Sequence, residues 1–227
     1  MTRDQRDRDC NPEPAVPLHP CEQAIERCRA ELRIVLHMET RAPRAAARSL
    51  DEQKLEFARR RGLAMPLAGL IAWSLVGIGG LVLPKIVEVW LLFGATGAIV
   101  YLGMFLSRFT GEHFLDPNRP KNAFDALFLR TVGMSLLVYA IAIPFFLVDY
   151  TSLPLTVGIL SGLMWLPLSW MIDHWVGTFH AVTRTLLVSA AWYLLPHARF
   201  VAVPFVIVAL YAVTITILEQ HWRTLQR

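Results

Sequence analysis

From residue 62 to residue 218 the chain is almost continuously apolar, and five short polar interruptions divide it into six runs long enough to cross a lipid bilayer. A helix rises about 1.5 Å per residue, so about 20 apolar residues span a hydrocarbon core of about 30 Å. Inside that core every backbone N–H and C=O group must be paired within the protein, which favours helices for runs of this length. The sequence therefore predicts an all-α, polytopic membrane protein.

The predicted protein has six transmembrane helices. They are expected at about residues 62–83, 86–107, 126–148, 153–171, 175–195 and 198–218. Four of the connections are only a few residues long, so the helices that they join should be antiparallel neighbours. The fifth connection, residues 108–125, contains two prolines, a glycine and mixed charge, and it is the only interior loop long enough to hold structure of its own.

Residues 1–48 are predicted to form a cytoplasmic extension ahead of a membrane domain over residues 49–227. Residues 1–18 mix charge and proline without apolar periodicity, which is typical of disorder. Residues 21–38 place apolar side chains at helical spacing and predict a short amphipathic helix. Because the first long apolar run begins only at Gly62, we expect no cleaved signal peptide.

The membrane domain begins with a helix-start signal. Ser49-Leu50-Asp51-Glu52 is a capping box, in which the Ser hydroxyl and the Glu carboxylate pair with the first free amides of a helix. The following residues continue with good helix formers as far as Arg61. We therefore expect this helix to run directly into the first span.

Cysteine usage favours free thiols over disulfides or a metal site. All three cysteines, Cys10, Cys21 and Cys28, lie in the predicted cytoplasmic extension, where thiols stay reduced. The nearby His19 and His37 are not at zinc-finger spacing. No metal and no other cofactor is predicted.

The distribution of Lys and Arg predicts that both termini are cytoplasmic, because cationic flanks of short loops are retained on that side. With the N-terminus inside, only Lys85 and Arg199 fall outside. The cytoplasmic side then holds Arg59, Arg60, Arg61, Arg108, Arg119, Lys121, Arg130, Arg223 and Arg227. We therefore interpret the net charge of +4 as a sign of the membrane topology. No basic stripe interleaved with aromatic residues is present, so the expected surroundings are lipid and no nucleic-acid partner is predicted.

The densest polar cluster lies at the start of the fifth span and contains Asp173, His174, His180 and Arg184. Read as one helix, Asp173, His180 and Arg184 share a face, with Arg184 about 15 Å deep by helical rise. An arginine at that depth costs several kcal/mol unless it faces the bundle interior, a carboxylate or water. It could simply join helices, paired to a carboxylate or to backbone carbonyls. The other interpretation is a site for a small anion or a proton, with Arg184 as the charge anchor and His180 as the titrating group.

A second polar group lies in the long loop. Glu112 and His113 are expected at the same membrane boundary as Asp173 and His174. Together with His180 they supply the carboxylates and imidazoles that bind a catalytic divalent metal or transfer protons. No HExxH or comparable spaced motif is present, and solvated loop charges are the alternative interpretation.

Three segments carry a resemblance to a known family. They are LDEQKLEFARRRGLAMPLAG from residue 50, Thr110-Gly111-Glu112, and LPLTVGILSGLMWLPLSWMIDHWVGTFHAVTRTLLVSAAWYLLP from residue 153. Over about residues 50–227 the chain resembles a family of small bacterial integral membrane proteins catalogued only as a domain of unknown function. The resemblance implies a bacterial cytoplasmic (inner) membrane location and no particular activity. Residues 1–48 fall outside it, as a lineage extension or through a start codon assigned too early.

These observations lead to three functional hypotheses. The leading one is a small transporter or a membrane-embedded binding protein with its polar site on the fifth span. The alternative is a membrane enzyme with a cytoplasm-facing metal or acid–base site made from Glu112, His113, Asp173, His174 and His180; we favour a protein that is not an enzyme. The third is a scaffold or accessory subunit, in which the polar groups only join helices. Small-residue faces such as Gly158-Ile-Leu-Ser-Gly162 could pack helices or join copies into an oligomer.

Overall fold

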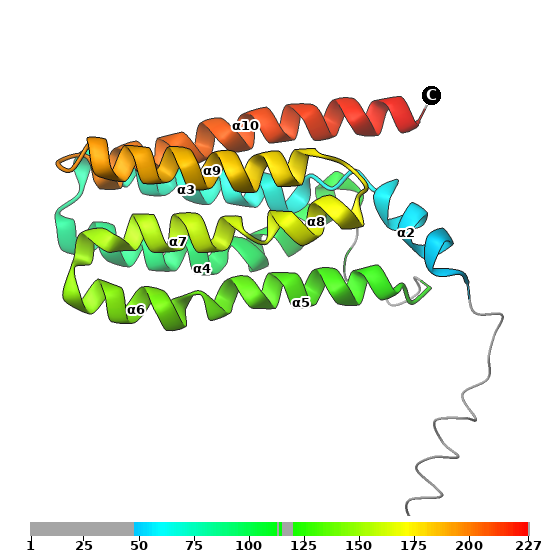
Figure 1. Ribbon diagram of the computed structural model, residues 1–227, viewed down its shortest axis with the longest axis horizontal. Helices are drawn as coiled ribbons and strands as arrows, with labels where there is room; N and C mark the ends of the chain where they lie inside the picture. Colours follow the sequence, from blue (N-terminus) through cyan, green and yellow to red (C-terminus); the bar gives the residue numbers. More distant parts are fainter. Residues whose placement is uncertain (1–47, 113, 115–119, 227) are drawn as a thin grey trace, which may run out of the picture. The chain divides into compact units, whose positions relative to one another are not determined.

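The computed structural model describes residues 48–112, 114 and 120–226, and within these residues the chain forms helices and turns without any strand. The predictions for residues 1–47 and for His113 lie outside the described residues. In chain order the helices are α2 (Leu50–Ala58), α3 (Ala64–Val82), α4 (Lys85–Thr110), α5 (Ala123–Leu137), α6 (Tyr139–Val148), the short 3-10 helix η1 (Tyr150–Ser152), α7 (Leu153–Gly162), α8 (Trp165–Met171), α9 (Val176–Leu194) and α10 (Arg199–Leu225) (Figure 1).

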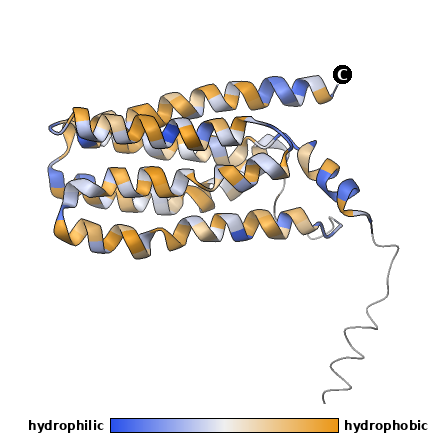
Figure 2. Ribbon diagram, viewed as in Figure 1, coloured by the Kyte–Doolittle hydropathy of each residue, from blue (hydrophilic) through white to orange (hydrophobic). Residues whose placement is uncertain are grey.

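Five helical stretches are long and apolar enough to cross a membrane, which supports an integral membrane protein. They are Ala64–Val82, Lys85–Thr110, Ala123–Val148, Tyr150–Met171 and Arg199–Leu225. Figure 2 shows apolar residues along most of their length, with hydrophilic residues more frequent on α2 and toward the C-terminal end of α10. The stretches correspond to five of the six predicted spans. Helix α9, which corresponds to the other one, carries His180 and Arg184 and is more polar than these five.

The capping box at Ser49 is confirmed, but the prediction of a continuous helix into the first span is wrong. The Ser49 hydroxyl accepts from the Glu52 amide at 3.1 Å, and the Glu52 carboxylate accepts from the Ser49 amide at 3.0 Å. Helix α2 then ends at Ala58, and the chain turns through Gly62 with φ +66°. Only a residue without a Cβ adopts that conformation at little cost, so Gly62 separates α2 from α3.

Prolines break one span and bend the course of another. The ring of Pro167 would clash with the carbonyl four residues earlier, that of Leu163, and α7 accordingly ends at Gly162 before α8 begins at Trp165. The stretch Ala123–Val148 likewise divides at Val138, shortly before Pro144 in α6. The α7–α8 break matters for the site, because it sets the position of Trp165.

One face of α9 packs against α7, α8 and α10, and α3 packs against α4 and α10. The predicted small-residue face at Gly158 is confirmed as a packing face, since a Cβ there would meet Ile207 and Val188 at 3.3 Å. A Cβ at Gly94 or Gly97 would meet nothing within 4 Å, so these two glycines of α4 face away from the described part of the bundle.

Candidate functional site

Arg184 is the centre of a polar site inside the bundle. Its side chain is completely buried, at 0% exposure. Nε donates to the Gly158 carbonyl at 2.7 Å, Nη2 to the Ser161 hydroxyl at 3.1 Å and Nη1 to the Tyr211 hydroxyl at 3.2 Å. The aliphatic part of Arg184 lies over Gly162, where a Cβ would come within 2.7 Å of Cδ. The missing side chain of Gly162 is therefore what makes room for the arginine.

His180 lies one helical turn before Arg184 and is also completely buried. Its Nδ1 is 2.8 Å from the Thr214 hydroxyl and its Nε2 is 3.5 Å from Nη1 of Arg184. An imidazole that accepts from arginine at Nε2 carries its hydrogen on Nδ1, which then donates to Thr214. The Trp165 ring stacks on the imidazole with the ring centres 4.4 Å apart. We call Ser161, Trp165, His180, Arg184, Tyr211 and Thr214 the interior site.

The guanidinium of Arg184 has only neutral partners among the described residues. None of the ion pairs in this part of the chain includes Arg184. The rings of Trp73 and Tyr211 each lie 5.5 Å from its Cζ, and these cation–π contacts disperse the charge without cancelling it. Of the two partners that a helix-joining role predicts, a carboxylate is absent from the described residues, and a backbone carbonyl, that of Gly158, is present. A cation in a medium of low dielectric constant strongly favours a negative charge nearby.

A small cavity adjoins the interior site. Ser161, Trp165 and Tyr211 line it on one side, and Thr96 and Tyr139 line it on another. We call it the inner cavity. Its volume is about 50 Å³, whereas a single water needs about 10–15 Å³. The inner cavity therefore fits a few waters or a small ion.

Tyr211 offers a hydrogen-bond donor at the wall of the inner cavity. Its hydroxyl oxygen accepts from Arg184, so its own hydrogen is directed elsewhere, and no acceptor for it lies among the described residues. The Thr96 hydroxyl, in contrast, donates to the Leu92 carbonyl at 2.6 Å, so it accepts from Tyr139 at the same distance. The buried indole N–H of Trp73 also lacks an acceptor in the described part of the chain. Buried donors without partners call for an acceptor such as a water or an anion.

Asp173 and His174 do not belong to the interior site, and the prediction that Asp173 shares a helical face with His180 and Arg184 is wrong. Helix α9 begins only at Val176, and Asp173 has φ +54° in the tight turn before it, a conformation that Asp tolerates better than most residues. Its carboxylate is 80% exposed and accepts from Lys54 at 3.0 Å.

His174 has a local role at the same end of the bundle. Its Nδ1 accepts from the Val176 amide at 3.2 Å, and its ring lies 4.3 Å from that of His221 on α10. Burial, together with the neighbouring His221 imidazole, lowers the pKa of His174.

Glu112 closes the start of α3. One carboxylate oxygen, Oε1, accepts from the amides of Leu63 at 2.7 Å and Ala64 at 2.9 Å. Only 4% of the residue is exposed. Burial raises the pKa of Glu112, against the opposing effect of the two amide hydrogen bonds. Its position beside the first amides of α3 identifies it as a helix cap.

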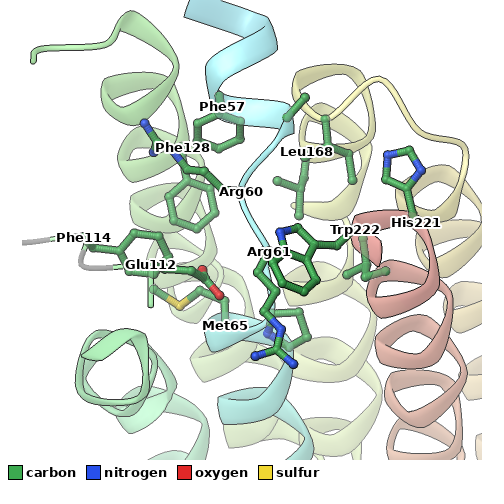
Figure 3. Close-up of a pocket in the computed structure, with 15 residues that line it drawn as sticks. Phe57, Arg60, Arg61, Met65, Glu112, Phe114, Phe128, Leu168, His221 and Trp222 are labelled. Atoms are coloured by element: carbon green, nitrogen blue, oxygen red, sulfur yellow. The ribbon is translucent and has the colours of Figure 1, made fainter. Parts of the chain in front are cut away.

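A second pocket lies beside Glu112, and we call it the end pocket (Figure 3). Aromatic and aliphatic side chains such as Phe57, Phe128 and Leu168 line most of it. Arg60 and Arg61 also line it. Both arginines are paired, Arg60 with Asp125 and Glu56, and Arg61 with both oxygens of Glu219 at 2.8 and 3.0 Å.

The described residues of the enzyme hypothesis, Glu112, Asp173, His174 and His180, are not gathered into one centre. Among the described residues no three His, Cys, Asp or Glu side chains lie close enough to hold a metal ion. Glu112 caps α3, Asp173 pairs with Lys54, and His180 lies in the interior site.

Sequence reasoning found His180 and Arg184 but missed their partners on other helices. Tyr211 and Thr214 lie three residues apart in an otherwise apolar run, and Ser161 interrupts the apolar stretch of α7. Polar residues at helical spacing inside a span were the available signal. The sequence pattern did not indicate which helices these residues would contact.

Comparisons with known proteins identify a family but no function. A family model described as "Family of unknown function (DUF7010)" matches residues 50–221. The comparisons with curated proteins and with solved structures gave no match.

Proposed function

The chain therefore belongs to the DUF7010 family, whose function is unknown, and we propose from the site itself that it is a membrane protein that binds a small monovalent anion between its helices. The observation that carries the proposal is the guanidinium of Arg184, which is fully buried and has only neutral partners among the described residues. Arginine keeps its charge at every physiological pH. A single negative charge in the inner cavity would balance it.

The size and chemistry of the inner cavity define the class of ligand. A volume of about 50 Å³ suits a halide, nitrate, bicarbonate or formate ion. The Tyr211 hydroxyl would donate to the anion while it accepts from Arg184, which polarises its O–H bond. A small transporter and a membrane-embedded binding protein would both use such a site, and anion flux into vesicles separates the two.

A site of this kind also requires that α9 crosses the membrane. We propose that α9 is the sixth span and that both termini are cytoplasmic, as the distribution of Lys and Arg favours. The buried face of α9 against α7, α8 and α10 supports this topology. In a bacterial host, a cytoplasm-active reporter fused after Arg227 should be active, and a cysteine at His197 should react with an impermeant thiol reagent added outside. A periplasmic C-terminus would contradict the six-span topology.

Anion binding is tested by thermal unfolding of the purified protein in detergent. Sodium nitrate should raise the unfolding midpoint relative to sodium gluconate of equal ionic strength, because gluconate is too large for the inner cavity. A ligand at 100 times its Kd stabilises the folded state by about 2.7 kcal/mol. Arg184→Gln and Tyr211→Phe should abolish the difference between the two salts.

Matched controls separate the site from general salt effects. Arg130→Gln removes an exposed arginine, and Tyr193→Phe removes a hydroxyl from a side chain that is 72% exposed. Both variants should respond to nitrate as the wild-type protein does. Arg184→Lys keeps the positive charge but loses the planar guanidinium. This variant should fold and should respond more weakly to nitrate. If Arg184→Gln and the wild-type protein respond equally, the interior site does not bind the anion.

A further inference from the structure

The inner cavity and the end pocket are adjacent along the bundle. They share four lining residues, Met65, Pro66, Phe128 and Leu168, which form the wall between them. The end pocket also contacts Arg60 and Arg61, just before α3, and the side chain of Arg61 is 35% exposed. Two adjacent cavities therefore lead from Arg60 and Arg61 to Ser161, Trp165 and Tyr211 of the interior site.

Arg60 supplies an unused donor in the end pocket. Its side chain is only 9% exposed, and its Nε–H has no acceptor among the described residues although its terminal nitrogens pair with Asp125 and Glu56. A buried N–H without a partner is rare in folded proteins and indicates a place for an acceptor that is not part of the chain. Its neighbour Arg61 is paired with Glu219, and Glu112 also lines the pocket, so the donor that favours an acceptor here is the Nε–H of Arg60.

Closely packed side chains separate the interior site from the other end of the bundle, where α9 connects to α10. Gly158 lies against Ile207, Val188 and Val203, which are all fully buried. A Cβ added at Gly158 would lie 3.3–3.6 Å from atoms of these three side chains. Beyond them, Arg199 at the start of α10 donates to the Thr151 hydroxyl at 2.6 Å, and Trp192 of α9 donates to the Thr151 carbonyl at 2.9 Å. These contacts join η1 to the ends of α9 and α10.

We infer that a small anion reaches Arg184 through the end pocket, and that Met65, Phe128 and Leu168 form the barrier that it must pass. The inference rests on the proposed function for the identity of the ligand. Met65 is suited to such a role because its side chain is flexible and lies over Gly103, where a Cβ would come within 2.3 Å of Sδ. The barrier consists of side chains, so rotamer changes suffice to open it.

The test measures access with a thiol reporter in the inner cavity. Thr96, which is 8% exposed and lines that cavity, is replaced by cysteine in full-length protein whose three native cysteines are changed to serine. The probe is iodoacetate, a small anionic thiol reagent with five non-hydrogen atoms. Met65→Ala should make labelling about tenfold faster, which corresponds to about 1.4 kcal/mol of barrier. The matched control Met134→Ala removes the same atoms from a side chain that is 46% exposed and should leave the rate unchanged.

A second pair of variants tests whether faster labelling comes from the opened barrier or from misfolding. Leu168→Ala should accelerate labelling as Met65→Ala does, whereas Leu187→Ala, at a position 45% exposed, should not. Arg60→Gln should slow iodoacetate severalfold and leave the neutral iodoacetamide, which has the same size, unaffected. Equal rates for the barrier variants and their controls would overturn the route. Labelling does not require binding at Arg184, so the route can fail while nitrate still stabilises the protein, or hold while nitrate does not.

Discussion

Replacing Gly177 by alanine is expected to destabilise the membrane domain strongly, while the same replacement at Gly94 is expected to be harmless. A Cβ at Gly177 would lie 2.4 Å from the Trp165 carbonyl oxygen and 2.9 Å from the Ser169 Cα. Both are backbone atoms, so no rotamer change relieves the clash, and α8 must move away from α9. Overpacking of this kind costs about 1–3 kcal/mol or more.

The displacement at Gly177 would also disturb the interior site. Trp165 stacks on His180, so a shift of α8 separates the two rings. At Gly94 the new Cβ meets nothing within 4 Å, and the gain in helix propensity of about 1 kcal/mol should make this variant slightly more stable. Thermal unfolding in detergent, followed by tryptophan fluorescence, compares the two. Equal midpoints for the two alanine variants would show that α8 and α9 do not pack as closely as described.

Removing the carboxylate of Glu112 is expected to have a comparably large effect. In Glu112→Ala the amides of Leu63 and Ala64 lose their acceptor at the buried start of α3. Each buried donor left unpaired costs about 1–3 kcal/mol, so we expect a loss of about 2–4 kcal/mol in the free energy of unfolding. Glu112→Gln keeps an acceptor oxygen for the two amides and should lose much less, because its uncharged group also avoids the cost of burying a charge.

The same pair of variants gives a pH signature. Burial raises the pKa of Glu112 above its ordinary value of 4.5, so the folded protein holds this proton more tightly than the unfolded chain. The contribution to stability is therefore complete below pH 4.5 and is lost as the pH rises through the raised pKa. Because both amides bond to Oε1, a proton on Oε2 leaves the cap intact. The stability of the wild-type protein relative to Glu112→Gln should fall as the pH rises through this range, because all other carboxylates titrate alike in the two proteins; parallel pH profiles would refute this assignment.

Five of the six spans and the capping box at Ser49 could be predicted because each depends on local pattern. The length of each apolar run predicts a span, and the spacing of Ser49 and Glu52 predicts the start of a helix. The errors arose where the backbone conformation of one residue decides the outcome, as at Gly62 and at Asp173, because a left-handed turn leaves no periodic signal.

The assembly of the interior site could not be predicted for a different reason. Arg184 meets Ser161 and Tyr211, which are 23 and 27 residues away in the sequence, and these pairings depend on how α7 and α10 pack against α9. The break caused by Pro167 adds to the difficulty, because it alters the course of the helix that carries Trp165. A periodic pattern identifies which face of a helix is polar but not which neighbour covers it.

The polarity of α9 also bears on how the protein is made. During synthesis α9 leaves the ribosome before α10, and an arginine at the centre of a lone helix raises the cost of insertion by about 2.5–3.5 kcal/mol. Arg184 and His180 find Tyr211 and Thr214 only on α10, which follows after the short connection between Leu194 and Arg199. On the proposed topology, α9 and α10 therefore enter the bilayer together as a helical hairpin. The interior site would then be completed only when α10 inserts, at the last step of biogenesis. A truncated chain that lacks α10 would therefore not place Arg184 in the lipid without its α10 partner.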